Sequence, residues 1–267
     1  MARVHLQFEG SPDFVQSLAR GLEVIRSFDE EQPSPSLSEL AERTGLSRAT
    51  VRRSLLTLAH LGYVGQKGRQ FFLTPRILEL GFGYLSSLGL PELALPFMET
   101  LAQRVGESCS LTVLDDADIV YVARVPVRRI MAISLGVGAR LPAFAASMGR
   151  VLLAGLPDDA LDEWLARAPT RPLTPHTVHE KSALRAEILR VRAQGYAVVL
   201  QELELGLCSI AVPVRERQGR TLAALNVGMP FGQGVRERAL KEILPALREA
   251  GQAIENAIVV VAPAVES

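Results

Sequence analysis

In the first quarter of the chain, apolar side chains recur at the three- and four-residue intervals of amphipathic helices. Three helices are predicted, over residues 14–28, 37–43 and 47–61. A proline- and serine-rich loop separates the first two, Ser36 or Ser38 can cap the second, and Gly45 forms the turn before the third. Two short β-like runs follow within residues 63–75 and predict a hairpin. This order of elements predicts a winged helix-turn-helix.

The third predicted helix divides into an apolar stripe and a polar arc. At about 100° per residue, Val51, Leu55 and Leu58 share the stripe. The polar residues gather in the first two turns, which is the end of a recognition helix that reaches base edges in the major groove. Arg48 lies nearer the stripe, so we expect it to contact a phosphate. With the cations of the hairpin tip, the predicted DNA contacts are Ser47, Arg48, Ala49, Thr50, Arg52, Arg53, Thr57, Lys67 and Arg69.

Charge strengthens this prediction. The chain is formally neutral, with 29 basic and 29 acidic residues, yet residues 43–76 hold basic side chains and no acidic one. A positive field concentrated on a helix-turn-helix is expected of a protein that binds duplex DNA. RNA or protein binding by the same basic helix is the alternative.

The pattern changes after the hairpin. A helix over residues 76–88 is apolar nearly all round, so we expect burial either against a second subunit or between two domains of one chain. Pro91 opens a further helix, 92–105, which Pro96 can kink. Beyond it the pattern predicts strands at 110–114, 119–124, 130–135, 208–214 and 221–228, and helices at 146–156, 158–167, 181–194 and 235–257. The mixture predicts an α+β fold, with a DNA-binding domain at 1–75, a linker helix at 76–90 and a second domain at 91–262.

Two strands of the second domain carry small and polar residues on one face. On strand 208–214, Ser209 and Ala211 alternate with larger apolar residues, and on strand 221–228, Asn226 and Gly228 do the same. Such a face leaves room for a ligand and offers it hydrogen bonds. The helix that begins near residue 146 follows a glycine- and proline-containing loop, and its free N–H groups would suit a carboxylate. Close helix packing against small residues is the alternative explanation. Arginines that could pair with a carboxylate are Arg124, Arg128 and Arg129.

The chain resembles the IclR family of bacterial transcription regulators from residue 14 to about 258. The resemblance rests on residues 17–25 (SLARGLEVI), the winged helix, residues 141–154 (LPAFAASMGRVLLA) and residues 206–230 (GLCSIAVPVRERQGRTLAALNVGMP). Residues 122–131 (VARVPVRRIM) and 140–154 (RLPAFAASMGRVLLA) are most similar to the PcaU/PcaR/PobR-like branch. That branch controls aromatic-acid catabolism and answers to 4-hydroxybenzoate, protocatechuate or β-ketoadipate.

The resemblance implies a GAF-like antiparallel sheet with helices as the effector-binding domain. The effector contacts that it implies are Ser147, Met148, Gly149, Ser209, Asn226 and Gly228. The family often has acidic residues ahead of strand 208–214; here Glu202 keeps a carboxylate, but the nearby aspartate is absent.

Other classes of protein are less well supported. The chain has no GxSxG, HExxH or P-loop motif, and His176 and His179 lack an evident third metal ligand, so we expect neither an enzyme nor a metal or cofactor. Cys109 and Cys208 are expected to be reduced core thiols. An architectural DNA binder without a ligand would leave two thirds of the chain unexplained. We therefore expect a cytoplasmic homodimer or homotetramer that binds an operator in double-stranded DNA and a small carboxylic acid, with RNA polymerase as a further partner.

Overall fold

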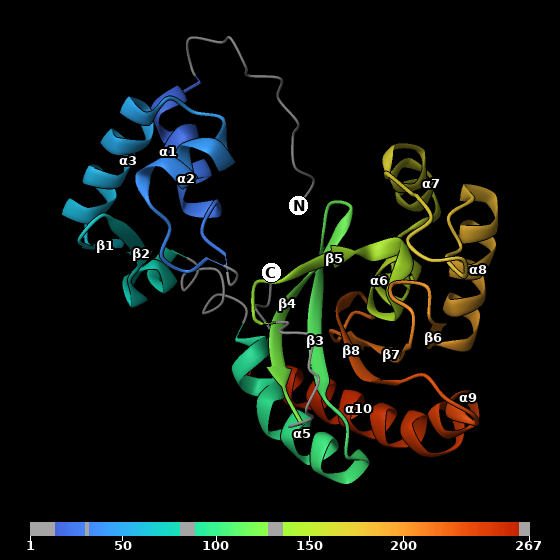
Figure 1. Ribbon diagram of the computed structural model, residues 1–267. Helices are drawn as coiled ribbons and strands as arrows, with labels where there is room; N and C mark the ends of the chain where they lie inside the picture. Colours follow the sequence, from blue (N-terminus) through green and yellow to red (C-terminus); the bar gives the residue numbers. More distant parts are fainter. Residues whose placement is uncertain (1–13, 30–31, 81–88, 128–135, 262–267) are drawn as a thin grey trace, which may run out of the picture. The chain divides into compact units, whose positions relative to one another are not determined.

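The computed structural model describes residues 14–29, 32–80, 89–127 and 136–261. The chain divides into two compact units, Met1–Ser87 and Leu88–Ser267 (Figure 1). Each unit has a hydrophobic core of its own, so each is described by itself.

The first unit is a three-helix domain with a β-hairpin. Its elements are α1 (Gln16–Arg26), α2 (Leu37–Thr44), α3 (Arg48–His60), β1 (Val64–Lys67) and β2 (Gln70–Leu73). The two strands pair antiparallel, with Lys67 opposite Gln70 at the tip. The predicted winged helix-turn-helix is thereby confirmed, with helix ends within two residues of the predicted ones.

Local chemistry sets the boundaries of α2. The Ser36 amide donates to the Glu39 carboxylate at 2.7 Å, and the Glu39 amide donates to the Ser36 hydroxyl at 3.4 Å, which forms a capping box. The bond from the Ser36 amide also lowers the pKa of the Glu39 carboxyl below its usual value. Gly45 ends the helix at φ 65°, a conformation that favours glycine. Beneath, Leu40, Val51 and Leu55 are fully buried and hold α2 against α3.

The linker begins differently from the prediction. Residues Pro75–Leu78 form a 3₁₀ helix, and the two residues after it are helical. Pro75 is the first residue of this 3₁₀ helix, one residue after Thr74 leaves the hairpin, and the Arg76 guanidinium lies 5.7 Å from the ring centre of Tyr63. The rest of the predicted linker helix lies outside the described residues.

The second unit is built on a six-stranded antiparallel sheet with strand order β5-β4-β3-β8-β7-β6. The strands are β3 (Cys109–Asp115), β4 (Asp118–Val125), β5 (Arg140–Pro142), β6 (Ala197–Leu200), β7 (Leu207–Arg215) and β8 (Thr221–Pro230). The sequence pattern predicted β3, β4, β7 and β8 but missed the two edge strands. These strands have three and four residues, which is too few to show the two-residue alternation of apolar and polar side chains that marks a strand. The predicted strand 130–135 lies outside the described residues.

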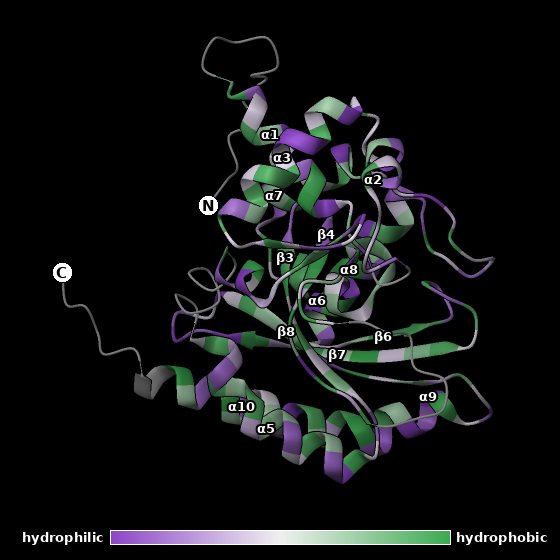
Figure 2. Ribbon diagram, turned by 60° about the vertical axis from the view of Figure 1, so that its left-hand side comes forward, coloured by the Kyte–Doolittle hydropathy of each residue, from purple (hydrophilic) through white to green (hydrophobic). Residues whose placement is uncertain are grey.

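Helices cover both faces of the sheet. On one face lie α5 (Leu90–Val105) and α10 (Leu244–Val261), side by side, with hydrophobic and hydrophilic residues alternating along each (Figure 2). On the other lies α6 (Ser147–Ala154), with α8 (Lys181–Gln194) packed on it and α7 (Asp158–Arg167) beside α8 (Figure 1). The predicted α+β class is confirmed.

The last predicted helix is not continuous. Residues 235–257 were expected to form one helix, but α9 (Val235–Arg238) passes into a π-helical turn, Ala239–Ile243, before α10 begins. Pro245 supplies a physical reason, because it has no amide hydrogen and its ring crowds the carbonyl of Lys241 four residues earlier.

Because side chains alternate along each strand, the two faces of the sheet carry side chains of different size and polarity. On the α10 face, a Cβ added at Gly251 would lie 3.3 Å from Val212 Cγ2, so the helix packs closely on the large apolar side chains. Cys109 and Cys208 are free, buried thiols, and burial raises their pKa values to about 12 and about 11 respectively. They are unreactive packing residues at neutral pH. The α6 face is small and polar, and it holds the candidate site.

Candidate functional site

Helix α3 presents the predicted DNA-contact residues on its outer surface. The Ser47 hydroxyl caps the helix by accepting from the Thr50 amide at 3.2 Å and lies 3.0 Å from the Thr50 hydroxyl. The Thr57 hydroxyl donates to the Arg53 carbonyl at 3.0 Å. Ala49, Arg52 and Arg53 are exposed beside them. The start of the helix therefore offers an ordered cap and an uncovered cationic surface.

Only part of the cationic block is available to a partner. The Arg43 guanidinium donates to the Ser27 carbonyl at 2.8 Å and pairs with Asp29 at 2.9 Å, so it joins α2 to the end of α1. The Arg48 guanidinium donates to the Ser38 hydroxyl at 2.7 Å, which directs it toward α2. Within residues 43–76, the exposed cations for which the described residues supply neither an ion pair nor a side-chain hydrogen bond are Arg52, Arg53, Lys67 and Arg69.

In the second unit, strand pairing brings the predicted effector residues onto one face. Asn226 of β8 lies opposite Ser110 of β3 and Ala211 of β7, and Gly228 lies opposite Ser209. Residues directly opposite each other in antiparallel strands point to the same side. Arg124 of β4 lies opposite Ser110, and its guanidinium donates to the Ser110 hydroxyl at 3.2 Å.

Helix α6 lies across this face against β7, β8 and β3. All eight of its residues are buried, yet no side chain caps its N-terminus among the described residues. A buried helix start has amide groups in need of acceptors, and it carries the positive end of the helix dipole. The start of α6 is therefore a place where an anionic ligand group would be stabilised.

Three buried polar atoms at this place have no hydrogen-bond partner among the described residues: Thr112 Oγ1, Ser147 Oγ and Asn226 Oδ1. Ser147 is the first residue of α6, while Thr112 and Asn226 lie on the sheet face that α6 covers. Each such atom costs about 1–3 kcal/mol unless something else satisfies it. We call Thr112, Ser147, Asn226, Ser110 and Arg124 the polar cluster.

The two predicted glycines differ in what surrounds them. A Cβ added at Gly149 would lie 2.0 Å from the Ala143 carbonyl oxygen, so this glycine allows the 3₁₀ turn Ala143–Ala145 to pack against α6. A Cβ at Gly228 would meet no atom within 4 Å, which shows open space above β8 beside the polar cluster. Met148 is buried, and Arg128 and Arg129 lie outside the described residues.

A buried ion pair that the sequence pattern does not predict anchors α6. The Arg150 guanidinium, 1% exposed, donates to both Glu202 oxygens at 2.8 and 2.5 Å and to the Phe144 carbonyl at 3.1 Å. The Val178 amide donates to the same carboxylate at 2.9 Å. Glu202 keeps a carboxylate of the family's acidic stretch, and its oxygens accept from Arg150 and Val178. Its role here is to hold α6 to the loop between β6 and β7.

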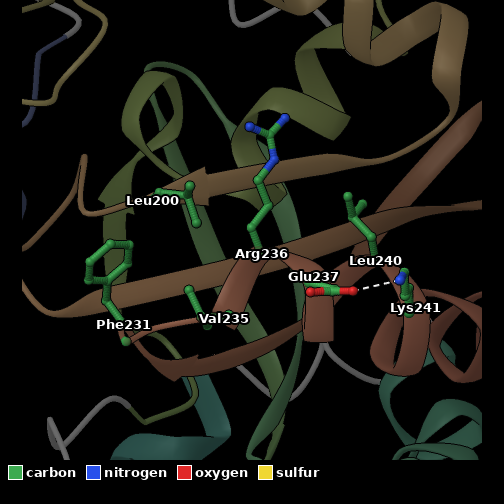
Figure 3. A pocket seen from close by; sticks show the side chains of 9 residues that line it. Leu200, Phe231, Val235, Arg236, Glu237, Leu240 and Lys241 are labelled. Carbon is green, nitrogen blue, oxygen red and sulfur yellow. Dashed lines mark hydrogen bonds and ion pairs between the residues drawn. The ribbon is translucent and has the colours of Figure 1, made fainter.

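Two hollows in the described surface lie away from the polar cluster. One, of about 600 Å³, lies at the β6 edge of the sheet, where Leu200, Phe231 and Val235 line it and Lys241 pairs with Glu237 at 2.5 Å (Figure 3). The other, of about 610 Å³, runs between α1 and α3 and is lined by Leu18, Leu22 and Leu61 among others. The first is largely apolar, and both differ in chemistry from the polar cluster.

Within the described ranges, no group of three histidine, cysteine or carboxylate side chains is placed to hold a metal ion. No helix among those residues combines the length and apolarity needed to cross a bilayer.

A basic winged helix joined to a separate sheet domain is the architecture of a DNA-binding transcription regulator. The IclR helix-turn-helix domain matches residues 17–68, and the bacterial transcriptional regulator IclR C-terminal domain matches residues 82–256. The chain belongs to the IclR family, as its motifs predicted, and so to a family of transcription regulators and not of enzymes.

Relatives support the predicted branch. The chain is 44% identical to the Pca regulon regulatory protein of Pseudomonas putida, over 92% of this chain and 84% of the relative. A crystal structure of a transcriptional regulator from Rhodococcus sp. RHA1 is 52% identical, with TM-score 0.83 over 93% of this chain and 100% of that one. An IclR homologue from Microbacterium hydrocarbonoxydans, complexed with 4-hydroxybenzoate, is 28% identical, with TM-score 0.81 over 91% and 99% of the two chains.

Proposed function

We propose that this regulator binds a hydroxylated aromatic acid at the polar cluster and thereby controls genes of aromatic-acid catabolism. The observation that carries the proposal is the group of unpartnered atoms, Thr112 Oγ1, Ser147 Oγ and Asn226 Oδ1, beneath the uncapped start of α6. The relative complexed with 4-hydroxybenzoate and the Pca relative support this class of ligand. In this proposal residues 1–75 bind DNA, 76–90 form the linker and 91–262 bind the effector.

The chemistry of the cluster fits the two ends of such a ligand. A carboxylate would accept from the amides at the start of α6, and Arg124 would supply a cation on the same face. A phenolic hydroxyl would donate to Asn226 Oδ1, which has no donor among the described residues. The open space over Gly228 would admit the ring, with Ser209 opposite it in the pairing.

The DNA-binding half of the proposal places α3 in the major groove. Arg52 and Arg53 are its base or phosphate contacts, and Lys67 and Arg69 of the hairpin touch the DNA backbone. A homodimer or homotetramer would set paired recognition helices against two half-sites, and RNA polymerase would be the partner at the promoter. Because its target is DNA, the protein would act in the cytoplasm.

Effector binding can change DNA binding only if the acid prefers one arrangement of the oligomer over another. Helix α6 is the element through which the preference would arise, because its start faces the ligand while Arg150 ties it to the β6–β7 loop.

Fluorescence anisotropy on duplex DNA from the gene's own upstream region, at fixed salt, tests the proposal. It compares binding alone with binding in the presence of 4-hydroxybenzoate, protocatechuate or β-ketoadipate, with a benzoate lacking the hydroxyl as control. A shift of the curve by 4-hydroxybenzoate or protocatechuate, but not by benzoate, is expected. A shift by β-ketoadipate alone would overturn the hydroxylated aromatic ligand. Tight, specific binding that is indifferent to all three would overturn the aromatic-acid assignment and favour another small carboxylic acid. Affinity that no small acid changes would favour the architectural binder.

Replacing Lys67 with alanine tests the hairpin contact. Loss of one phosphate contact should weaken binding to all duplexes alike and reduce the slope of log K against log salt by about one. The measurement is a salt titration by anisotropy on specific and scrambled duplexes. Lys241→Ala, which removes an exposed lysine of the second unit, is the matched control and should leave the slope unchanged. A Lys67→Ala protein with altered sequence preference and an unchanged slope would contradict the hairpin assignment.

A further inference from the structure

One large apolar side chain on α3, that of Leu56, does not pack into the hydrophobic core. Leu56 is 46% exposed, whereas the other large aliphatic residues of the helix, Val51, Leu55 and Leu58, are buried. Exposing an isolated leucine is ordinary on a protein surface. Its position on this helix gives it significance.

Leu56 lies on the outward ridge of α3, between the two free arginines. At about 100° per residue it falls about 40° from Arg52 on one side and about 60° from Arg53 on the other. Ala49, seven residues earlier, lies within about 20° of it, so Ala49 and Leu56 form a short apolar stripe with cationic margins. The stripe faces away from the buried side chains that hold α3 in its domain.

Ala49 and Leu56 do not line the groove between α1 and α3. The groove is lined by Thr50, Arg53 and Thr57 of α3 but not by Leu56. A partner lying in that groove would therefore leave Leu56 uncovered. An apolar helix face flanked by arginines is suited to contact the floor of a DNA major groove.

Bases offer one apolar group in the major groove, the thymine C5-methyl, which aliphatic side chains can contact. We propose that Leu56 is a specificity-determining residue that contacts a thymine methyl of the operator, while Arg52 and Arg53 bind the flanking base edges or phosphates. The proposal rests on α3 being the helix that enters the DNA, and it adds a sequence preference that the arginines alone do not supply.

The test is a uracil scan. The full-length protein is first footprinted on its own upstream DNA, and each protected thymine is then replaced singly by deoxyuridine, which lacks only the methyl. At one thymine per half-site the wild-type protein should lose about fourfold in affinity (about 0.8 kcal/mol, one buried methyl), and Leu56→Ala should lose nothing there. Leu205→Ala, which truncates a leucine 59% exposed in the second unit, should reproduce the wild-type scan.

The outcomes distinguish failure of the Leu56 contact from failure of the proposed DNA binding by α3. A wild-type footprint with a uracil penalty that Leu56→Ala retains at every thymine would overturn the Leu56 contact while leaving DNA binding intact. A Leu56→Ala protein that loses affinity equally for all sequences would also overturn it, and would indicate a protein contact between copies of the chain. Absence of any footprint would count against DNA binding by α3 itself. Circular dichroism of each variant checks that the helix is retained.

Discussion

Replacing Glu202 with alanine is expected to lower the free energy of unfolding of the second unit by about 3–5 kcal/mol. Arg150 is 1% exposed, and its guanidinium would lose both short bonds to Glu202 and keep only Glu187, 3.8 Å away, as a carboxylate partner. Arg has no neutral form at accessible pH, so the cost cannot be avoided by deprotonation. The Val178 amide would lose its acceptor as well. The result would be a folded domain close to its limit of stability.

The single tryptophan makes this measurement specific to the second unit. Trp164 of α7 is buried there, and its indole donates to the Asp116 carbonyl at 2.7 Å, so its fluorescence in urea follows this unit. Glu249→Ala is the matched control, because its pair with Arg104 is exposed and should contribute less than about 1 kcal/mol. Protein concentration must be held fixed because an oligomer's stability depends on it.

A double replacement distinguishes the buried charge from simple loss of volume. Arg150→Met with Glu202→Leu removes both charges and keeps apolar bulk, so most of the lost stability should return. If Glu202→Ala costs no more than Glu249→Ala, the ion pair is not the anchor of α6 that its geometry indicates.

The second large effect is expected at Gly228. A leucine there should reduce effector affinity by about 10- to 100-fold, because it would occupy the space assigned to the ligand ring, and overpacking costs about 1–3 kcal/mol. The fold should tolerate it, since a Cβ at this position meets no atom within 4 Å. The readout is the loss of the acid-induced anisotropy shift together with an unchanged Trp164 urea transition.

Gly232→Leu is the control for this prediction. Its Cβ would also meet open space, but the residue lines the hollow at the β6 edge and not the polar cluster. Asn226→Leu gives an independent check, because it should abolish the response while holding or raising stability, since an unpartnered buried oxygen is removed. A Gly228→Leu protein with a full acid response would place the effector elsewhere.

The sequence predicted best what local chemistry determines. The bounds of α7 and α8 agree with the prediction to the residue, since a proline precedes one helix and a glycine ends the other. The alternation along β7 and β8 also predicted the small, polar face, because strand geometry fixes which side chains share a side.

What the sequence could not predict depends on contacts across the fold. Arg150 and Glu202 are 52 residues apart, and nothing in the spacing identifies them as partners. Gly149 was predicted from the resemblance as an effector contact, yet its packing on Ala143 depends on how the 3₁₀ turn folds back on α6. The unpartnered atoms of the polar cluster likewise become visible only when β3, β8 and α6 are brought together.

The central pairing of the sheet has a consequence for synthesis on the ribosome. Thr112 of β3 pairs with Ala224 of β8, 112 residues later (224 − 112), while the neighbours β3–β4 and β7–β8 are close in the chain. At a translation rate of about 5–20 residues per second, roughly 6–20 s pass between the synthesis of β3 and that of its partner β8. The first unit precedes β3 in the chain, so it can already be folded during that interval. Until then the β3–β4 hairpin keeps an open edge at β3, and such an edge exposes the nascent domain to chaperones and to aggregation.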